Sequence, residues 1–345
     1  MPHSVRFVEP LVVALVEQDE PPLRPDEVRL HTLYSGISAG TELTAYRGSN
    51  PYLNKEWDAR RRLFLPGGST VTYPVDGWGY EEVGIVAEVG AAVTRVHKRQ
   101  LVWGSWGHRG SVVQTEEYAA ARMFPPDADP VLGIFSHIGA IALNIVLDAD
   151  IHVGETVAVF GLGVPGQVAA QLARLNGARV IAVDAIPDRL AKAAELGAQH
   201  TIDAREGNTA ERIRELTEDR GADVSLEVSG SYRALHEAIR STAYGARVVS
   251  GGFFQGDGMG LALGEEFHHN RIQLVCSQIS GPPPALSNRW TKYRLQRTAI
   301  ELAVGGQLQL QPLISHVLPV EEAPAAFQLL DETPEQALQV VLKFS

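Results

Sequence analysis

The segment Val157-Ala158-Val159-Phe160-Gly161-Leu162-Gly163-Val164-Pro165-Gly166 decides the fold, because an apolar run leads directly into glycines spaced Gly-x-Gly-x-x-Gly. The sequence predicts a buried strand at Thr156–Phe160 and a helix at Val164–Asn176. The first glycine permits a tight turn, the second lets a ligand approach the backbone, and the third lets helix and strand pack closely. Free N–H groups and the positive dipole end of such a helix attract phosphate. We therefore predict that a dinucleotide pyrophosphate is held by Gly161, Gly163, Val164, Pro165 and Gly166.

A second predicted strand, Arg179–Val183, is followed directly by Asp184. A carboxylate at this position accepts hydrogen bonds from the adenosine ribose and repels a 2′-phosphate, which favours NAD over NADP. Arg189 follows in the next helix, where it would either stack on the adenine or face solvent. The alternative interpretation of the whole segment is a structural turn that binds no nucleotide.

Strands and helices continue to alternate, which predicts an α/β fold with a doubly wound, parallel, six-stranded Rossmann sheet. The further predicted strands are His200–Ile202, Val224–Val228, Arg247–Ser250 and Ile272–Cys276, and the further helices are Pro187–Leu196, Thr209–Asp219 and Tyr232–Ala243. Ligands bind at the carboxyl ends of such strands. We predict that Ser229, Gly251, Gly252 and Phe253 line the nicotinamide; the alternative is that they form turns required only by packing.

The chain before this region is β-rich, with short strands predicted at Glu27–Leu33, Gly84–Val89 and Leu101–Trp103. Tyr46–Thr72 is expected to be a long irregular loop, and loops of this length are often functional. Val131–Ala149 predicts a buried helix. After the sheet come a helix near Arg294–Val304 and a strand at Gln339–Phe344. We therefore predict a β domain at 1–128 and 288–345 and a Rossmann domain at 129–287.

Composition limits the possible partners. A formal net charge of -11 argues against nucleic acid or an anionic membrane, which both select basic surfaces. No apolar run suggests a signal peptide or a membrane span, so a cytoplasmic protein is expected. The single cysteine, Cys276, excludes an intrachain disulfide and a multi-cysteine metal cluster.

This layout resembles the medium-chain dehydrogenase/reductase superfamily, in which a GroES-like β domain precedes a Rossmann domain. The resemblance covers nearly the whole chain. Its supporting motifs are Tyr34–Glu42, Gly79–Gly84 and Gly154-Glu155-Thr156. It implies a small-molecule substrate and a homodimer or homotetramer.

The zinc alcohol dehydrogenases of that superfamily carry a cysteine ligand just before Gly-Thr in the first motif and a histidine ligand before the glutamate of the second. This chain has Ala39 (or Ser38, after a one-residue shift) at the first position and Tyr80 at the second. The third ligand position matches His137, and the four-cysteine structural zinc lobe is absent. Catalytic zinc needs about three convergent protein ligands. The resemblance thus implies a member without catalytic metal; a site rebuilt from His137, Glu81 and another ligand is the alternative.

The segments Gly40–Glu42, Arg47–Tyr52 and Phe267–Asn270 resemble a subgroup of sugar dehydrogenases that oxidise the C3 hydroxyl of glycosides. Without zinc, a side chain must remove the alcohol proton. The candidate is His137, whose ordinary pKa lies near working pH. The resemblance suggests Tyr80 as a hydrogen-bond donor to the same oxygen, Glu81 as an orienting group and Thr41 as a proton relay. The alternatives are that His137 is simply a core histidine and that Tyr80 simply fills space. The residues predicted to bind the sugar are Arg47, Asn50, Tyr52, Trp57 and His268.

The leading hypothesis is therefore NAD-dependent oxidation of a secondary alcohol of a sugar, glycoside or polyol. A zinc-free quinone or enone reductase using NAD(P)H is the first alternative, and Asp184 speaks against its usual preference for NADPH. The others are a zinc-dependent alcohol dehydrogenase with atypical ligands and a nucleotide-sensing protein that has lost its chemistry.

Overall fold

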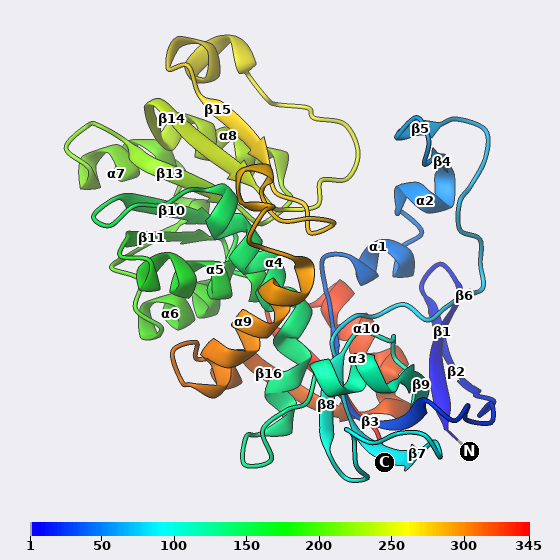
Figure 1. The fold of residues 1–345 in the computed structure, drawn as a ribbon. Helices are drawn as coiled ribbons and strands as arrows, with labels where there is room; N and C mark the ends of the chain where they lie inside the picture. Colours follow the sequence, from blue (N-terminus) through cyan, green and yellow to red (C-terminus); the bar gives the residue numbers. More distant parts are fainter. Residues whose placement is uncertain (1) are drawn as a thin grey trace. The chain divides into compact units, whose positions relative to one another are not determined.

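The computed structural model describes residues 2–345, which divide into two compact units (Figure 1). Unit 1 contains the residues up to His137 together with Ile314–Ser345, and unit 2 contains Ile138–Leu313. Helix α4 (Phe135–Asp148) begins in unit 1 and continues into unit 2.

Unit 2 is built on one parallel six-stranded sheet with the order β12-β11-β10-β13-β14-β15. Its strands are β10 (Thr156–Phe160), β11 (Arg179–Asp184), β12 (His200–Asp203), β13 (Ala222–Glu227), β14 (Thr242–Ser250) and β15 (Gln273–Cys276). Its helices are α5 (Val164–Leu175), α6 (Pro187–Glu195), α7 (Thr209–Leu216), α8 (Tyr232–Ser241) and α9 (Lys292–Val304), with short turns η2 (Ala204–Glu206), η3 (Leu263–Phe267), η4 (Pro284–Leu286) and η5 (Gln311–Leu313). The predicted doubly wound Rossmann sheet is confirmed.

The central strand β10 is buried along its whole length, as expected where helices cover both faces of a parallel sheet. Gly163 is the N-cap of helix α5, and Ser231 is the N-cap of helix α8, where its side chain accepts a hydrogen bond from the N–H of Ala234.

Unit 2 also includes 288–313, which we had assigned to the β domain. Gln171 on α5 fixes this segment, because its side chain accepts a hydrogen bond from the N–H of Gln309 and donates one to the carbonyl of Gln309. A side-chain carbon at Gly139 would lie 2.7 Å from Cβ of Ala299, so α4 and α9 pack closely. These contacts explain why the domain boundary lies later in the chain than predicted.

Unit 1 contains a six-stranded mixed sheet in which β16, β17, β3, β7 and β8 are neighbours in that order and β9 pairs with β3. The bounds are β3 (Glu27–Ile37), β7 (Glu82–Val89), β8 (Leu101–Gly104), β9 (Ser111–Thr115), β16 (Ile314–Pro319) and β17 (Gln339–Lys343). A second sheet has the order β2-β1-β6, with β1 (His3–Glu9), β2 (Val12–Glu17) and β6 (Val75–Asp76). The helices are α1 (Glu42–Tyr46), α2 (Pro51–Asn54), α3 (Glu116–Ala121) and α10 (Ala323–Glu332), with turns η1 (Pro130–Ile134) and η6 (Val320–Glu322).

The expectation of an irregular loop at Tyr46–Thr72 is wrong in part. This segment contains α2 and a small hairpin of β4 (Glu56–Asp58) and β5 (Leu63–Leu65). The elements are only three or four residues long, so periodicity gave no signal for them.

The apolar helix predicted over Val131–Ala149 is confirmed as η1 followed by α4. By length and composition Pro130–Asp148 would suffice to cross a membrane, but 78% of its most apolar window is buried inside the protein. This is the burial expected of a core helix.

Candidate functional site

The three fingerprint glycines have distinct steric roles in unit 2. Gly161 has φ 90°, and a side-chain carbon there would lie 2.6 Å from Cβ of Ser229. A side-chain carbon at Gly166 would lie 1.9 Å from the carbonyl oxygen of Gly161, which only glycine avoids. At Gly163 the nearest such atom is Cδ of Pro165, 3.9 Å away. The first and third glycines are therefore required by packing, whereas the second leaves open space beside the start of α5, where Val164 and Pro165 form the first turn.

Asp184 at the end of β11 shapes the same turn. One carboxylate oxygen accepts the N–H of Leu162 at 2.6 Å, and the other accepts the N–H of Ile186 at 2.9 Å. Each oxygen retains capacity for a second hydrogen bond, which a ribose hydroxyl can donate. Arg189 lies on α6, and its carbonyl accepts a hydrogen bond from the side chain of Gln167. Asp184 therefore connects the fingerprint turn to the start of the next helix.

The turns after β13 and β14 touch one another. A side-chain carbon at Gly252 would lie 2.3 Å from the nitrogen of Gly230, and one at Gly251 would lie 2.3 Å from Cδ1 of Ile145. Both predicted glycines thus meet a packing requirement, and Phe253, which follows them, is exposed. The hydroxyl of Ser229 donates to the Glu227 carboxylate rather than pointing outward.

Sequence reasoning missed Glu227, the last residue of β13. Its side chain is fully buried and accepts the N–H groups of Ser229 at 2.9 Å and Gly230 at 3.1 Å. Burial raises the pKa of Glu227 to about 7, and the hydrogen bonds from Ser229 and Gly230 oppose that increase. The available signal was a carboxylate within the predicted strand Val224–Val228, directly before the Ser229-Gly230 turn.

In unit 1, three of the predicted catalytic residues, Tyr80, Thr41 and His137, lie close together with Ser38. The Tyr80 hydroxyl forms a short hydrogen bond with the hydroxyl of Ser38 and donates to Oγ1 of Thr41 at 3.3 Å. The imidazole of His137 packs against the tyrosine ring, with 4.5 Å between centroids and 51° between planes. Withdrawal of the hydroxyl from water, together with nearby Glu81, raises the pKa of Tyr80, so the phenol remains protonated at neutral pH.

Glu81 does not orient Tyr80 or His137 through a hydrogen bond. Its carboxylate is fully buried beside Gly36 and the amide of Gln339, and neither oxygen has a well-formed hydrogen bond. Burial raises the pKa of Glu81 well above its ordinary value, and the neighbouring carboxylates add to the shift. Glu81 therefore contacts Gly36 and Gln339, and it lacks the hydrogen bond to Tyr80 or His137 that an orienting group would make.

A buried polar chain supports the Ser38 end of this cluster. Glu42 accepts the N–H of Ser38 at 2.9 Å with one oxygen, and its other oxygen pairs with Nε2 of His108. Nδ1 of His108 lies 2.6 Å from the hydroxyl of Ser35, which donates to Glu82 at 3.1 Å. Since the hydroxyl has one proton to give, His108 must donate through Nδ1.

His108 therefore holds protons on both nitrogens when Glu42 is ionised. Burial alone would lower the pKa of His108, but Glu42 and Glu82 outweigh burial and raise it. Burial raises the pKa of Glu82 to about 6, opposed by His108 and by the N–H of Trp106. The sequence gave no sign of this hydrogen-bonded network, because Glu42 and His108 lie far apart in the sequence.

The side chains at the zinc-ligand positions do not fit a zinc ion. Ser38 and Tyr80 hydrogen-bond to each other, and the raised pKa of the phenol makes it a poor anionic ligand. Among residues 2–345, no three His, Cys, Asp or Glu side chains lie in an arrangement that could hold a metal ion. Within residues 2–345, the alternative site built on His137 and Glu81 therefore lacks a third ligand of these types.

The predicted substrate residues differ in their availability. Asn50 is buried, where it caps α2 by accepting the N–H of Tyr52 at 3.0 Å and donates to Thr44 at 2.6 Å. Tyr52 and Trp57 both pack on Phe64, with ring centroids 5.4 and 4.8 Å apart. This aromatic cluster of Tyr52, Trp57 and Phe64 is partly exposed, so it offers apolar ring faces to a ligand.

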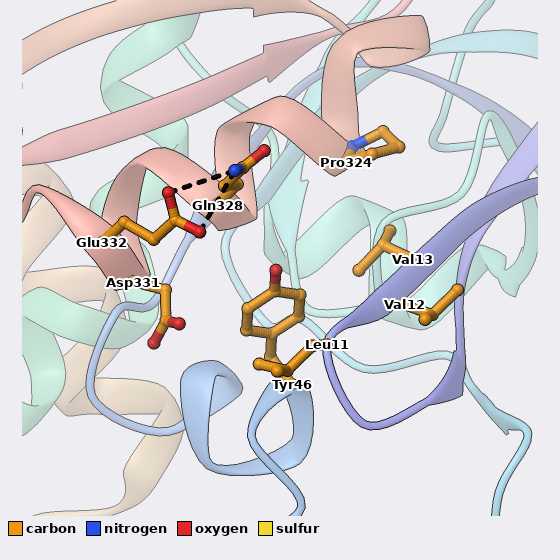
Figure 2. A pocket seen from close by; sticks show the side chains of 8 residues that line it. All are labelled: Leu11, Val12, Val13, Tyr46, Pro324, Gln328, Asp331 and Glu332. Atoms are coloured by element: carbon orange, nitrogen blue, oxygen red, sulfur yellow. Dashed lines mark hydrogen bonds between the residues drawn. The ribbon is translucent and has the colours of Figure 1, made fainter.

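Arg47 is paired with Asp331 on α10 at 2.5 Å. Asp331 also lines a pocket of about 340 Å³, seen in Figure 2, together with Leu11, Val12, Val13, Tyr46, Pro324, Gln328 and Glu332. None of the pocket residues belongs to the predicted site, and Tyr46 stacks on Phe327 of the unit 1 core. We therefore assign this pocket no part in the proposed chemistry.

His268 lies in unit 2 and is exposed, with its ring against the edge of His269. It precedes the amino end of β15, whereas the fingerprint glycines follow the carboxyl end of β10. Because the strands are parallel, these are opposite edges of the sheet. The structure thus separates His268 from the predicted cofactor site.

Comparison with known proteins agrees with this architecture. Residues 165–292 match the zinc-binding dehydrogenase family. D-guloside 3-dehydrogenase of Escherichia coli K12 is 29% identical over 343 residues, covering 97% of this chain and 98% of that protein.

Two solved structures share the fold. Galactitol-1-phosphate dehydrogenase of Escherichia coli superposes with TM-score 0.78 at 21% identity, covering 99% of both chains. A zinc-binding dehydrogenase of Sinorhizobium meliloti 1021 bound to NADP superposes with TM-score 0.79 at 22% identity, again covering 99% of both. Residues 165–292 therefore form a zinc-binding dehydrogenase domain, and over nearly its whole length the chain is similar to sugar and alcohol dehydrogenases, which are oxidoreductases.

Proposed function

We propose that the protein oxidises a secondary alcohol of a sugar, glycoside or polyol with NAD, and that a side chain rather than zinc removes the proton. One observation carries the proposal: the zinc-ligand positions hold the hydrogen-bonded Ser38–Tyr80 pair with His137 packed against it. These groups exchange or donate protons, and they replace the ligand set that zinc needs.

Asp184 supports NAD as the cofactor. Dehydrogenases of this superfamily use a nicotinamide dinucleotide, and an ionised carboxylate at the end of β11 accepts ribose hydroxyls but repels a 2′-phosphate. Its two hydrogen bonds to backbone N–H groups hold that charge in place beside the fingerprint turn. NADP would bring a second negative charge to the same position.

The proposed chemistry needs two transfers. The C–H bond of the alcohol breaks with its electron pair, and the hydride goes to C4 of the nicotinamide. The O–H proton goes to His137, whose imidazole accepts it. On substrate binding the single O–H of the protonated Tyr80 phenol turns from Thr41 to the reacting oxygen and donates its hydrogen bond there, while Tyr80 still accepts from the Ser38 hydroxyl. Thr41 passes on protons as a neighbour.

A carbohydrate substrate is supported by the relative from Escherichia coli, which is named for a guloside, and by the aromatic cluster of Tyr52, Trp57 and Phe64. Sugar rings present apolar C–H faces that pack on aromatic side chains, and their hydroxyls need polar partners. A quinone or enone would not need the proton-accepting imidazole beside a hydroxyl pair. We therefore favour oxidation of an alcohol over reduction of an enone.

The test is NADH formation against a panel of glycosides, free sugars, polyols and simple secondary alcohols, before and after exhaustive chelation, with metal analysis of the purified protein. We expect turnover of a carbohydrate that chelation leaves unchanged in a protein without stoichiometric zinc. His137→Gln should abolish turnover, while exposed His152→Gln serves as the matched control. Loss of activity on chelation and its return with zinc would overturn the side-chain mechanism, and turnover of enones alone would overturn the substrate class.

A further inference from the structure

The order of strands across the sheet assigns positions to the parts of the cofactor. Asp184 ends β11, the fingerprint turn follows β10, and β13 and β14 come next along the same edge. Neighbouring strands lie about 4.8 Å apart. If the ribose lies at Asp184 and the pyrophosphate at Gly163, the remaining part of the dinucleotide meets the turns after β13 and β14.

Glu227 joins those two turns. Its carboxylate accepts hydrogen bonds from the turn after β13, namely from Ser229 N–H, the Ser229 hydroxyl and Gly230 N–H. Its main-chain carbonyl accepts hydrogen bonds from the turn after β14, from Gly251 N–H at 2.8 Å and Gly252 N–H at 3.1 Å. One residue thus binds both segments predicted to face the nicotinamide.

The turns after β13 and β14 are closely packed against Glu227 and against each other. A side-chain carbon at Gly230 would lie 2.7 Å from the carbonyl oxygen of Phe253, and one at Gly252 would lie 2.7 Å from Oε2 of Glu227. The turn after β13 also packs against the fingerprint, because a side-chain carbon at Gly161 would meet Ser229. Movement of the carboxylate would therefore displace the turns after β10, β13 and β14 together.

A buried carboxylate destabilises the folded protein unless hydrogen bonds or an ion pair stabilise its charge. Val224 and Leu226, on the opposite face of β13, are apolar and fully buried. On its own face Glu227 follows Asp223 and Ser225, whose polar side chains are hydrogen-bonded to Thr156 and Thr242. No ion pair involving Glu227 occurs among residues 2–345, so hydrogen bonds to the turns are what stabilise its charge. Burying an unpaired charge is unfavourable, and an apolar residue here would leave the donors of the turn unsatisfied.

We propose that Glu227 is a positioning residue that shapes the nicotinamide end of the cofactor site, an inference that rests on the proposed use of NAD(H). It acts through Ser229, Gly230, Gly251 and Gly252 rather than by touching substrate. We do not expect Glu227 to affect the adenosine end, which Asp184 and the fingerprint hold.

The test compares two ligands at pH 8, where Glu227 is ionised: NADH, and ADP-ribose, which has the adenosine and pyrophosphate but lacks the nicotinamide. In Glu227→Gln an amide N–H would face the N–H of Gly230. We expect the dissociation constant for NADH to rise roughly tenfold and that for ADP-ribose to change by less than about twofold. Calorimetry measures both without turnover.

The matched control is Asp223→Asn, the same chemical change at the opposite end of β13, where Asp223 accepts the N–H of Thr156 at 2.8 Å. It should leave both affinities unchanged even if it lowers the melting temperature. If Glu227→Gln does not fold, Ser229→Ala removes one donor and should weaken NADH selectively but less. Equal weakening of both ligands, or of neither, would overturn the inference while leaving the proposed reaction intact; wild-type protein that binds no NADH would instead overturn the proposed function.

Discussion

Two substitutions in the fingerprint turn, Gly166→Ala and Gly163→Ala, should have different effects: the first should lower stability and the second should weaken cofactor binding. In Gly166→Ala the new carbon would lie 1.9 Å from the carbonyl oxygen of Gly161, so helix α5 must move away from β10. Overpacking typically costs 1–3 kcal/mol, and because both groups are backbone-fixed we expect about 3 kcal/mol. For a unit of this size that corresponds to a fall in melting temperature of roughly 6–12 °C.

In Gly163→Ala the new carbon meets no protein atom closer than 3.9 Å, and the residue has φ −62°, which alanine adopts without strain. The stability change should stay below about 1 kcal/mol, because glycine and alanine differ only modestly at a helix cap. The methyl group, however, would occupy the space through which the pyrophosphate approaches. We expect NADH to bind at least roughly tenfold more weakly.

Differential scanning fluorimetry and NADH titration of the two variants provide the comparison. A Gly166→Ala protein that melts within about 2 °C of wild type would refute the packing argument. A Gly163→Ala protein that binds NADH like wild type would show that the pyrophosphate does not lie at the start of α5.

Asp184→Asn keeps the size of the side chain but removes its charge, so the ratio of NAD to NADP affinity should fall roughly tenfold in a titration of both cofactors; an unchanged ratio removes the role of Asp184. His137→Ala should suppress turnover of any substrate found, with NADH affinity unchanged by calorimetry, and retained turnover would exclude it as the base. His108→Gln should lower the unfolding free energy by about 3–5 kcal/mol in urea, because Glu42 is left buried without its partner, and adding Glu42→Gln should recover part of the loss. The folded pKa of Glu227, about 7, exceeds its ordinary 4.5, so the folded state keeps a proton that the unfolded chain releases. The unfolding free energy should therefore fall as pH rises from about 4.5 to 7, by up to about 3 kcal/mol, and Glu227→Gln should flatten that slope in denaturant titrations at several pH values.

The nucleotide-binding unit was predictable because its signals are local. The predicted bounds of Thr156–Phe160 match β10, and the turn glycines occupy the positions that the fingerprint requires. Each strand and its following helix are neighbours in sequence, so apolar runs and turn residues identify both.

The first unit was harder because its contacts are distant in sequence. Strands β1 and β2 were not predicted, and β17 pairs with β3 across almost the whole chain. Short strands in a mixed sheet give weak alternation, so only the assembled structure shows them.

For the candidate site too, the sequence predicted the residues that lie in motifs and missed those brought together by tertiary packing. Tyr80, Thr41 and His137 could be named from motif positions, and the structure brings Tyr80 close to both of the others. Glu227 and the Glu42–His108 pair were missed, since a charged residue in a sequence is normally expected at the surface. Their burial is a property of tertiary packing that no local pattern encodes.

Strand β17 has a consequence for how the protein is made. Its residues Val340, Val341 and Leu342 are fully buried between β3 and β16, so the sheet of unit 1 is complete only with them. Unit 2 is continuous in sequence and is synthesised in between. At a translation rate of about 5–20 residues per second, β3 emerges from the ribosome roughly 15–60 s before its last partner, β17. During that interval β3 presents an unpaired edge, which makes the nascent chain, rather than the finished enzyme, the form most in need of a chaperone.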